Sequence, residues 1–188
     1  GDGLGQAPVA DFPPLEPEQI EYWVDGKVGQ DDGQISEIKL LIHNESVHPP
    51  HLDPLLSVRY YFNVSELAQW DQGVEDMRVQ LTYDGRAVDN GMLNSGDGLP
   101  TIVTGPFAWD EDEGLYYFDF AFTGCKFYGS IPLEFQLVVD FASDYAFHQD
   151  SANDYSRQGL PTGDDYAVAN RVTMYSDGVR IAGEEPPR

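Results

Sequence analysis

Acidic and amide side chains gather in the stretch SANDYSRQGL and directly before it. Asp150, Asn153 and Asp154 surround a tight Asn-Asp turn. Such a turn is typical of a solvated loop, because Asn and Asp side chains bond to nearby backbone groups. The same residue types also suit calcium, which binds about six to eight oxygen atoms from carboxylates, amides and backbone carbonyls. Turn chemistry alone favours the solvated loop, and a calcium site is the competing interpretation.

Catalytic residues do not emerge from any pattern in the sequence. Neither the G-x-S-x-G nucleophile elbow nor the H-E-x-x-H metal motif occurs. His48 and His51 in VHPPH could together bind a metal ion. However, no third ligand is nearby in the sequence, and paired histidines in loops are usually solvated. The acidic run from Asp110 to Glu113 could pair carboxylates for glycoside hydrolysis, although it is more typical of a solvated hairpin tip. We therefore expect no enzyme on this chain, with a hydrolase built on that acidic run as an alternative.

The chain is strongly acidic. Its 188 residues include 33 acidic and 10 basic ones, for a formal net charge of −23. Nucleic acids and anionic membranes bind clustered Lys and Arg, so we expect neither as a partner, whereas a neutral polysaccharide is compatible with this charge. The single cysteine, Cys125, excludes an intrachain disulfide. No apolar run approaches the roughly 18 residues that a membrane-spanning helix needs.

The elements that must position these residues are short strands. Alternating or apolar runs are bounded by Gly, Pro, Asn or Asp, which predicts an all-β sandwich in one domain. The runs lie at residues 20–28, 35–44, 55–64, 77–83, 115–124, 133–142 and 170–181. Alternation in YYFDFAF predicts that Phe118, Phe120 and Phe122 share one face. Residues 64–70 predict a helical turn. Residues 1–17 are rich in Gly, Pro and acidic residues and predict a linker from an upstream, catalytic domain, with the folded module at 18–186.

Whole phrases of the sequence resemble a known family. DFPPLE, EIKLLIHNES, LLSVRYYFNVSEL, YYFDFAFTGCKFY, NDYSRQGL and VTMYSDGVRIAGEEP occur in the order seen in family 3 carbohydrate-binding modules. They are most similar to subclass c, the modules fused behind the catalytic domain of family 9 glycoside hydrolases, which are endoglucanases. The resemblance covers roughly residues 11–186. It implies a nine-stranded jelly-roll β-sandwich with a structural calcium ion (Ca2+), in a secreted, extracellular and monomeric module.

The resemblance also implies a calcium ligand set, which resolves the opening ambiguity in favour of calcium. One half of the set comes from the segment before and within NDYS, and the other half follows the RYYF phrase. The implied ligands are Asn63, Ser65, Glu66, Asp150, Asn153 and Asp154. Two carboxylates with amide or hydroxyl oxygens and carbonyls suit calcium, and the ion would join two chain segments that are distant in the sequence.

A polar strip for a single cellulose chain, or a related β-glucan, is the first surface that the resemblance implies. Its residues here are Asp76, Met77, Tyr83, Gln136 and Asp140. In the family, the strand at 133–142 alternates Arg, Glu, Gln and Arg, and this sequence departs from that pattern. Ala146 also stands where the cellulose-anchoring subclasses carry a Trp. We therefore expect weak binding of a single chain and no strong binding to crystalline cellulose.

The second implied surface is a shallow groove on the opposite face, formed by Arg59, Tyr61, Tyr117 and Tyr155. Exposed tyrosines beside an arginine suit an extended Pro-rich linker or peptide. The competing interpretation is that these tyrosines are half-buried sandwich residues. The leading hypothesis is an accessory module that packs on a family 9 catalytic domain in the same polypeptide. The alternative is a structural or peptide-binding module with little or no sugar binding.

Overall fold

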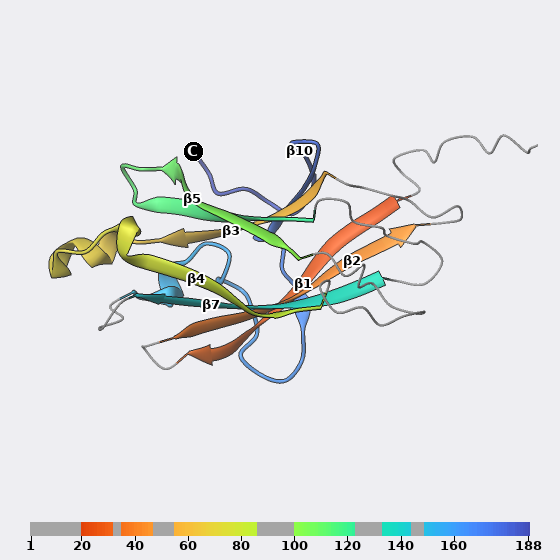
Figure 1. Cartoon of the computed structure of the whole chain (residues 1–188), viewed down its shortest axis with the longest axis horizontal. Helices are drawn as coiled ribbons and strands as arrows, with labels where there is room; N and C mark the ends of the chain where they lie inside the picture. Colours follow the sequence, from red (N-terminus) through yellow and green to blue (C-terminus); the bar gives the residue numbers. More distant parts are fainter. Residues whose placement is uncertain (1–19, 32–34, 47–54, 86–99, 123–132, 144–148) are drawn as a thin grey trace, which may run out of the picture.

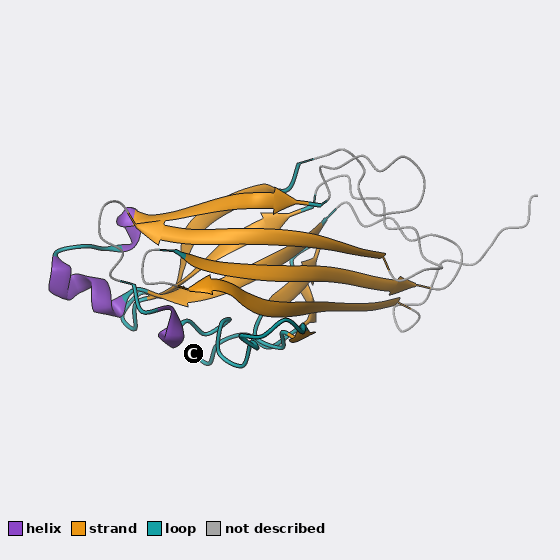
Figure 2. Ribbon diagram, turned by 90° about the horizontal axis from the view of Figure 1, so that it is seen from below, coloured by secondary structure: helices purple, strands orange, loops and turns teal. Residues whose placement is uncertain are grey.

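Two five-stranded antiparallel sheets face each other, as Figures 1 and 2 show. The computed structural model describes residues 20–31, 35–46, 55–85, 100–122, 133–143 and 149–188. One sheet has the order β4-β7-β2-β1-β8 and the other β10-β9-β3-β6-β5. The strands are β1 (Ile20–Asp31), β2 (Ser36–Ser46), β3 (Leu56–Asn63), β4 (Met77–Asp84), β5 (Ile102–Asp110), β6 (Leu115–Ala121), β7 (Leu133–Ser143), β8 (Ala167–Val168), β9 (Thr173–Ser176) and β10 (Val179–Ala182). Three short 3-10 helices connect them: η2 (Ser65–Trp70), η3 (Val74–Asp76) and η4 (Ser151–Asn153).

The core lies between the sheets, because alternate side chains of each central strand point inward. On β2 the fully buried residues include Ile38, Leu40 and Ile42. On β3, Phe62 stacks on Phe118 of β6 with ring centroids 5.0 Å apart. Burial of each large apolar side chain contributes about 1.5–3 kcal/mol, so these central strands dominate the stability of the sandwich.

The predicted all-β sandwich is confirmed. Phe118, Phe120 and Phe122 are buried, at 2%, 0% and 0% exposure, which confirms the predicted alternation. The helical turn predicted at 64–70 is the 3-10 helix η2. The acidic run after Asp110 is the exposed turn between β5 and β6, as its interpretation as a hairpin tip predicts.

The described residues contain ten strands in two sheets, one more than the nine predicted. The sequence pattern missed β5, an edge strand with little apolar alternation that contains Gly105 and Pro106; edge strands tolerate proline because one side needs no hydrogen-bond donor. The run at 170–181 divides into β9 and β10 at Asp177 and Gly178. Both residues have positive φ, 49° and 75°, as a tight hairpin turn requires.

Some predictions fall on residues outside the described ranges. These are the linker at 1–17, the pair His48 and His51, Cys125 and Ala146. Within the described part of the chain, none of the helices has the length and hydrophobicity to cross a membrane.

Candidate functional site

The six residues predicted to hold calcium come together in one cluster. The backbone N–H of Asn63, at the end of β3, donates to Asp154 Oδ1 at 2.9 Å. Glu66 in η2 accepts from the Asp150 backbone N–H at 2.7 Å and from Asn153 Nδ2 at 2.8 Å. Ser65 belongs to the cluster through its hydroxyl, which donates to Asn63 Oδ1 at 2.6 Å. The segment around η4 is therefore joined to the end of β3 and to helix η2, which lie more than 80 residues earlier in the sequence.

Asp154 is the buried centre of this cluster, with 1% of its surface exposed. Burial raises the pKa of its carboxyl well above the usual range; the Asn63 N–H opposes this shift, and the nearby carboxylate of Glu66 adds to it. Gln149 Nε2 donates to both Asp154 oxygens, at 3.1 and 3.2 Å. A second carboxylate close to a buried one is an arrangement that a divalent cation would stabilise.

Two buried amide oxygens in the cluster, Gln149 Oε1 and Asn153 Oδ1, have no hydrogen-bond partner among the residues that the structure describes. Buried polar oxygens normally accept a hydrogen bond or bind an ion, because leaving one unsatisfied costs about 1–3 kcal/mol. Among the described residues, no three His, Cys, Asp or Glu side chains group closely enough to hold a metal. An ion here would therefore need amide and carbonyl oxygens beside the carboxylates of Glu66 and Asp154. This all-oxygen donor set fits calcium.

Gln149 was missed by the sequence analysis. It directly precedes Asp150, but nothing in the local pattern indicates that a glutamine in a polar stretch is buried, at 6% exposure. Only the packing of this segment against β3 and η2 explains its position.

Tyr83 is the member of the predicted sugar strip that the structure places on the outer face of the β4-β7-β2-β1-β8 sheet, with 44% of its surface exposed. Regular alternation would put residue 83 on the same side as Leu81, whose register partner Val139 is buried in the core. A register shift between Leu81 and Tyr83 pairs Tyr83 with Val138 instead. Such bulges re-aim side chains, and this one directs Tyr83 away from the core.

Met77 does not lie on that outer face. Its side chain is 6% exposed and packs in the core. Met77 precedes the bulge and therefore points to the same inward side as Leu81. Asp76 ends η3, where its Oδ2 accepts from the Gly73 N–H at 2.9 Å. Gln136 and Asp140 lie on β7, in register with Leu41 and Glu37 of β2; their side chains are outside the described part. The five residues of the predicted strip therefore lie in different environments. Met77 is in the core, Asp76 caps η3 and Tyr83 is exposed. Gln136 and Asp140 lie on the neighbouring strand.

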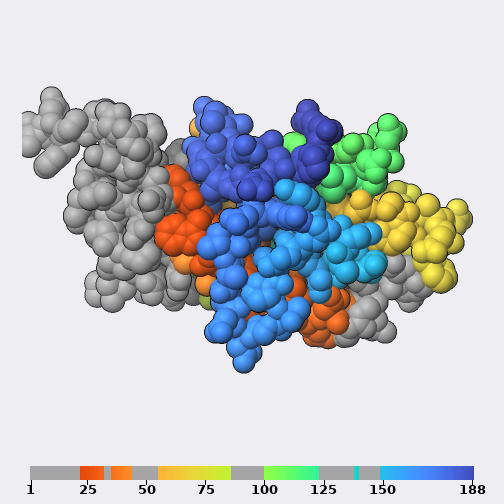
Figure 3. Space-filling model, turned by 180° about the vertical axis from the view of Figure 1, so that it is seen from behind, coloured from red at the N-terminus to blue at the C-terminus, as the bar shows by residue number. Residues whose placement is uncertain are grey.

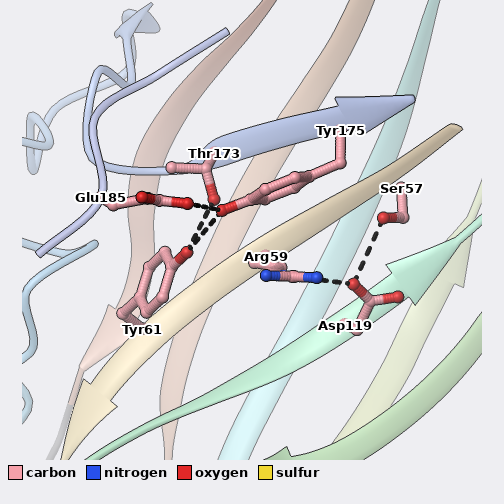
Figure 4. A network of polar contacts seen from close by, with 7 residues as sticks. All are labelled: Ser57, Arg59, Tyr61, Asp119, Thr173, Tyr175 and Glu185. Carbon is pink, nitrogen blue, oxygen red and sulfur yellow. Dashed lines mark hydrogen bonds and ion pairs between the residues drawn. The ribbon is translucent and has the colours of Figure 1, made fainter. Parts of the chain in front are cut away.

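Arg59, Tyr61 and Tyr117 lie on the outer face of the other sheet (Figure 4 shows the first two). Arg59 Nε donates to Asp119 Oδ1 at 3.2 Å, and its guanidinium stands 4.0 Å from the ring centroid of Tyr175. These contacts hold the arginine side chain between Asp119 and the Tyr175 ring on the outer face of this sheet.

Tyr61 is fully buried, at 0% exposure, which differs from the predicted exposed groove residue. It points outward from the sheet, but the rings of Trp109, Tyr117 and Tyr155 pack around it with centroids 5.3, 5.6 and 6.1 Å away. Its hydroxyl bonds to those of Thr173, at 3.1 Å, and Tyr175, at 3.0 Å (Figure 4). Burial raises the pKa of the Tyr61 hydroxyl. Tyr117 and Tyr155 are half-buried.

The ring planes of this aromatic cluster are steeply inclined to one another. Tyr61 makes angles of 77° with Trp109 and 89° with Tyr155. A flat polysaccharide surface stacks only on rings presented in one plane, so these rings do not form such a platform. They pack against one another in a cluster, which we call the aromatic cluster: Arg59, Tyr61, Trp109, Tyr117, Tyr155 and Tyr175. Trp109 and Tyr175 were not among the predicted site residues, because β5 and the pairing of β9 with β3 were not predicted.

Comparison with known proteins identifies the family to which this chain belongs. Residues 22–183 match the family model CBM3, described as cellulose binding domain. Endoglucanase A of Bacillus pumilus is 26% identical over 189 residues, covering 99% of this chain and 26% of that protein. Endoglucanase 4 of Bacillus sp. (strain KSM-522) is 27% identical over 185 residues, covering 97% and 27%. The chain therefore spans about a quarter of the length of these curated relatives.

Solved structures agree with this assignment. The crystal structure of endoglucanase CelQ from Clostridium thermocellum complexed with cellotriose has a TM-score of 0.71 and 26% identity, covering 95% of this chain and 28% of that chain. Carbohydrate-binding module CBM3b from the cellulosomal cellobiohydrolase 9A of Clostridium thermocellum has a TM-score of 0.61 at 20% identity, covering 88% and 98%, and shows the shared fold alone. Because the family model matches most of the sequence, this chain belongs to the cellulose binding domain family CBM3.

Proposed function

We propose that this chain is a non-catalytic accessory module, of subclass c, in a secreted endo-1,4-β-glucanase. It packs on a family 9 catalytic domain of the same polypeptide and guides or weakly binds a single cellulose chain. Family membership supports binding of cellulose, and the curated relatives matched over nearly the whole chain are endoglucanases. The CelQ structure, matched over 95% of this chain, contains cellotriose.

The outward position of Tyr83 is the observation that carries this proposal. The bulge in β4 exposes the tyrosine ring on the outer face of the sheet, beside β7. A half-exposed ring can lie against the face of one glucose unit, and polar groups on β7 and β2 can bond to its hydroxyls. One ring without coplanar neighbours binds weakly, which suits guidance of a chain better than anchoring to crystalline cellulose.

Calcium is the proposed cofactor. Glu66 and Asp154 supply carboxylates, and amide or carbonyl oxygens of Asn63, Asn153 and Asp150 complete the set. The two orphaned amide oxygens and the raised pKa of Asp154 support this assignment. The ion would neutralise the two neighbouring carboxylates and stabilise the junction between β3 and the η4 segment, because ligand binding to the folded state alone stabilises that state.

Affinity electrophoresis in gels containing soluble cellulose tests the sugar-binding face. Tyr83→Ala is expected to abolish most of the retardation of the wild-type chain. Phe107→Ala is the matched control, because Phe107 is equally exposed, at 45% against 44%, and lies on the opposite sheet. Equal loss in both variants would refute the assignment of the face. A wild-type chain that is not retarded at all would instead favour a structural role beside the catalytic domain.

A further inference from the structure

A pocket of about 370 Å³ lies between the turn that follows η4 and the segment that contains β8. Residues 158–160 and 168–171 line it, and none of them belongs to the predicted sugar strip or to the aromatic cluster. Figure 3 shows both segments, in blue, over the middle of one side of the molecule. The volume falls within the range of about 300–1,000 Å³ that is usual for small-molecule sites.

Hydrogen bonds to both sheets hold the walls of this pocket in place. The Ser156 N–H donates to the Tyr61 carbonyl at 3.1 Å, and the Val28 N–H donates to the Pro161 carbonyl at 2.9 Å. The turn at 156–161 therefore crosses from β3 of one sheet to β1 of the other. The Ser156 hydroxyl also donates to the Arg171 carbonyl at 2.6 Å, which joins the two walls. The pocket is thus formed before any ligand enters.

Arg171 brings a guanidinium without an acidic partner to this pocket. Its Nη1 donates to Gln158 Oε1, and the group stands 4.8 Å from the ring centroid of Tyr155. In the described part of the chain no carboxylate lies within ion-pair distance of Arg171, although the sequence contains 33 acidic residues. The described arginines that do pair with a carboxylate are Arg59, Arg157 and Arg180.

The other lining side chains are partly amides and partly apolar. Gln158 Oε1 accepts from Arg171, so the amide nitrogen of Gln158 is left to donate. Asn170 is exposed and supplies a second amide. Leu160 is half-buried, and Val168 has 56% of its surface exposed. A sugar ring carries C–H groups on its faces and hydroxyls at its edge, so this mixture of side chains suits a sugar.

We propose that this pocket binds a uronic acid residue, a sugar that carries a carboxylate. The free N–H groups of Arg171 bind the carboxylate, since a guanidinium and a carboxylate can form two parallel charge-assisted hydrogen bonds. The amides of Gln158 and Asn170 bond to ring hydroxyls, and Leu160 and Val168 contact the ring face. A neutral glucose unit has no group that pairs with the guanidinium, so it binds more weakly.

The net charge of −23 does not exclude an anionic ligand at this position. At an ionic strength of 0.15 M, interactions between exposed charges are screened beyond about 8 Å. The guanidinium at the pocket therefore dominates the field that a bound carboxylate experiences. The inference goes beyond the proposed function and does not depend on sugar binding at Tyr83.

A titration followed by nuclear magnetic resonance tests the proposal on the ¹⁵N-labelled wild-type chain. Sodium glucuronate, glucose and sodium acetate are added separately, at constant ionic strength and constant excess calcium. Glucuronate is expected to shift the backbone amide signals of residues 158–160 and 168–171 in a saturable way. Glucose and acetate should each bind at least about tenfold more weakly, because glucose lacks the carboxylate and acetate lacks the sugar ring.

Substitutions at the pocket identify the group that binds the carboxylate. Arg171→Gln should weaken glucuronate binding at least about tenfold, and Arg171→Lys should cause a smaller loss because it keeps the charge without the planar fork. Arg180→Gln is the matched control: it makes the same change in charge at an exposed side chain outside the pocket, and it should bind as wild type. Val168→Glu places a carboxylate at the pocket wall and should abolish binding while leaving Arg171 in place.

Four outcomes would overturn the proposal: no saturable shift with glucuronate, equal affinity for glucuronate and glucose, wild-type affinity in Arg171→Gln, or the same loss in the Arg180→Gln control. Tight binding of acetate alone would likewise show a site for carboxylates in general rather than for uronic acids. If Arg171→Gln does not fold, Val168→Glu decides, because its position is exposed and wild-type affinity in that variant would exclude the pocket.

Discussion

Replacing Asp154 by asparagine is expected to remove the response of this protein to calcium. Asp154 is 1% exposed, and burial raises its pKa because an ionised carboxylate loses its hydration there. Asparagine keeps an oxygen to accept from the Asn63 N–H. Rotation of the Gln149 amide would present its unpartnered Oε1 to the new amide nitrogen. The substitution is therefore nearly isosteric and removes the charge while its hydrogen bonds can be kept.

The magnitude follows from ligand linkage. At a calcium concentration 100-fold above the dissociation constant, binding stabilises the folded state by about 2.7 kcal/mol. For a domain of 150–250 residues, 1 kcal/mol corresponds to a change in Tm of about 2–4 °C. Wild type should therefore melt about 5–10 °C higher in calcium than in EDTA. Asp154→Asn should show only a small part of this difference, because the site loses one of its two closest carboxylates.

In EDTA, where calcium is removed, wild type should lose its advantage in stability over Asp154→Asn. The folded-state pKa of Asp154 is raised above the unfolded value of about 3.9, so the folded state binds the proton more tightly. Stability from this group is full below pH 3.9 and decreases as pH rises through the folded pKa. At neutral pH without calcium, Asp154→Asn should thus be at least as stable as wild type, and calcium should stabilise wild type more as pH rises.

Scanning calorimetry of both proteins, in calcium and in EDTA, measures all four Tm values. A wild-type Tm that does not change on chelation would refute the calcium site itself. An Asp154→Asn variant with the full wild-type calcium shift would leave the site in place but refute the assignment of Asp154 as a ligand. Ala152→Gly is a control at an exposed position of η4, and it should retain the calcium response.

Three further substitutions test the sandwich and its aromatic cluster. Tyr61→Phe should lower the free energy of unfolding in urea by about 1–2 kcal/mol, because it leaves the buried hydroxyl of Thr173 short of a partner and weakens the position of Tyr175; an unchanged urea midpoint would contradict this role. Gly183→Ala should cost at least about 1–2 kcal/mol, since φ is +80° and the new Cβ would lie 2.4 Å from a backbone oxygen; thermal melting checks it, with Gly163→Ala, which has open space, as control. Phe120→Ala should cost about 3–5 kcal/mol, because the side chain is fully buried between the sheets, and a smaller loss would mean that the core collapses around the cavity.

The sequence pattern predicts which side chains point inward in a strand that has one buried face, such as β6. The alternation in YYFDFAF predicts the inward phenylalanines of β6, because side chains in a strand have a period of two and only one face of this strand meets the core. The edge strand β5 carries no such alternation, and it was missed for that reason. The residues that the resemblance assigns to one ligand set lie together around Asp154 in the structure, but burial of Gln149 beside them depends on how the η4 segment packs on β3.

The sequence by itself determined the class of fold, the family and the segments that form the acidic cluster, because these depend on composition, periodicity and the order of phrases. Tertiary structure alone decided which side chains reach each surface. A bulge that the pattern does not encode turns Tyr83 outward while Met77 stays in the core. Rings contributed by β5, β9 and the η4 segment bury Tyr61, although its strand position points it outward. The exposed fraction of a side chain depends on all the residues that pack over it, and those neighbours come from distant parts of the chain.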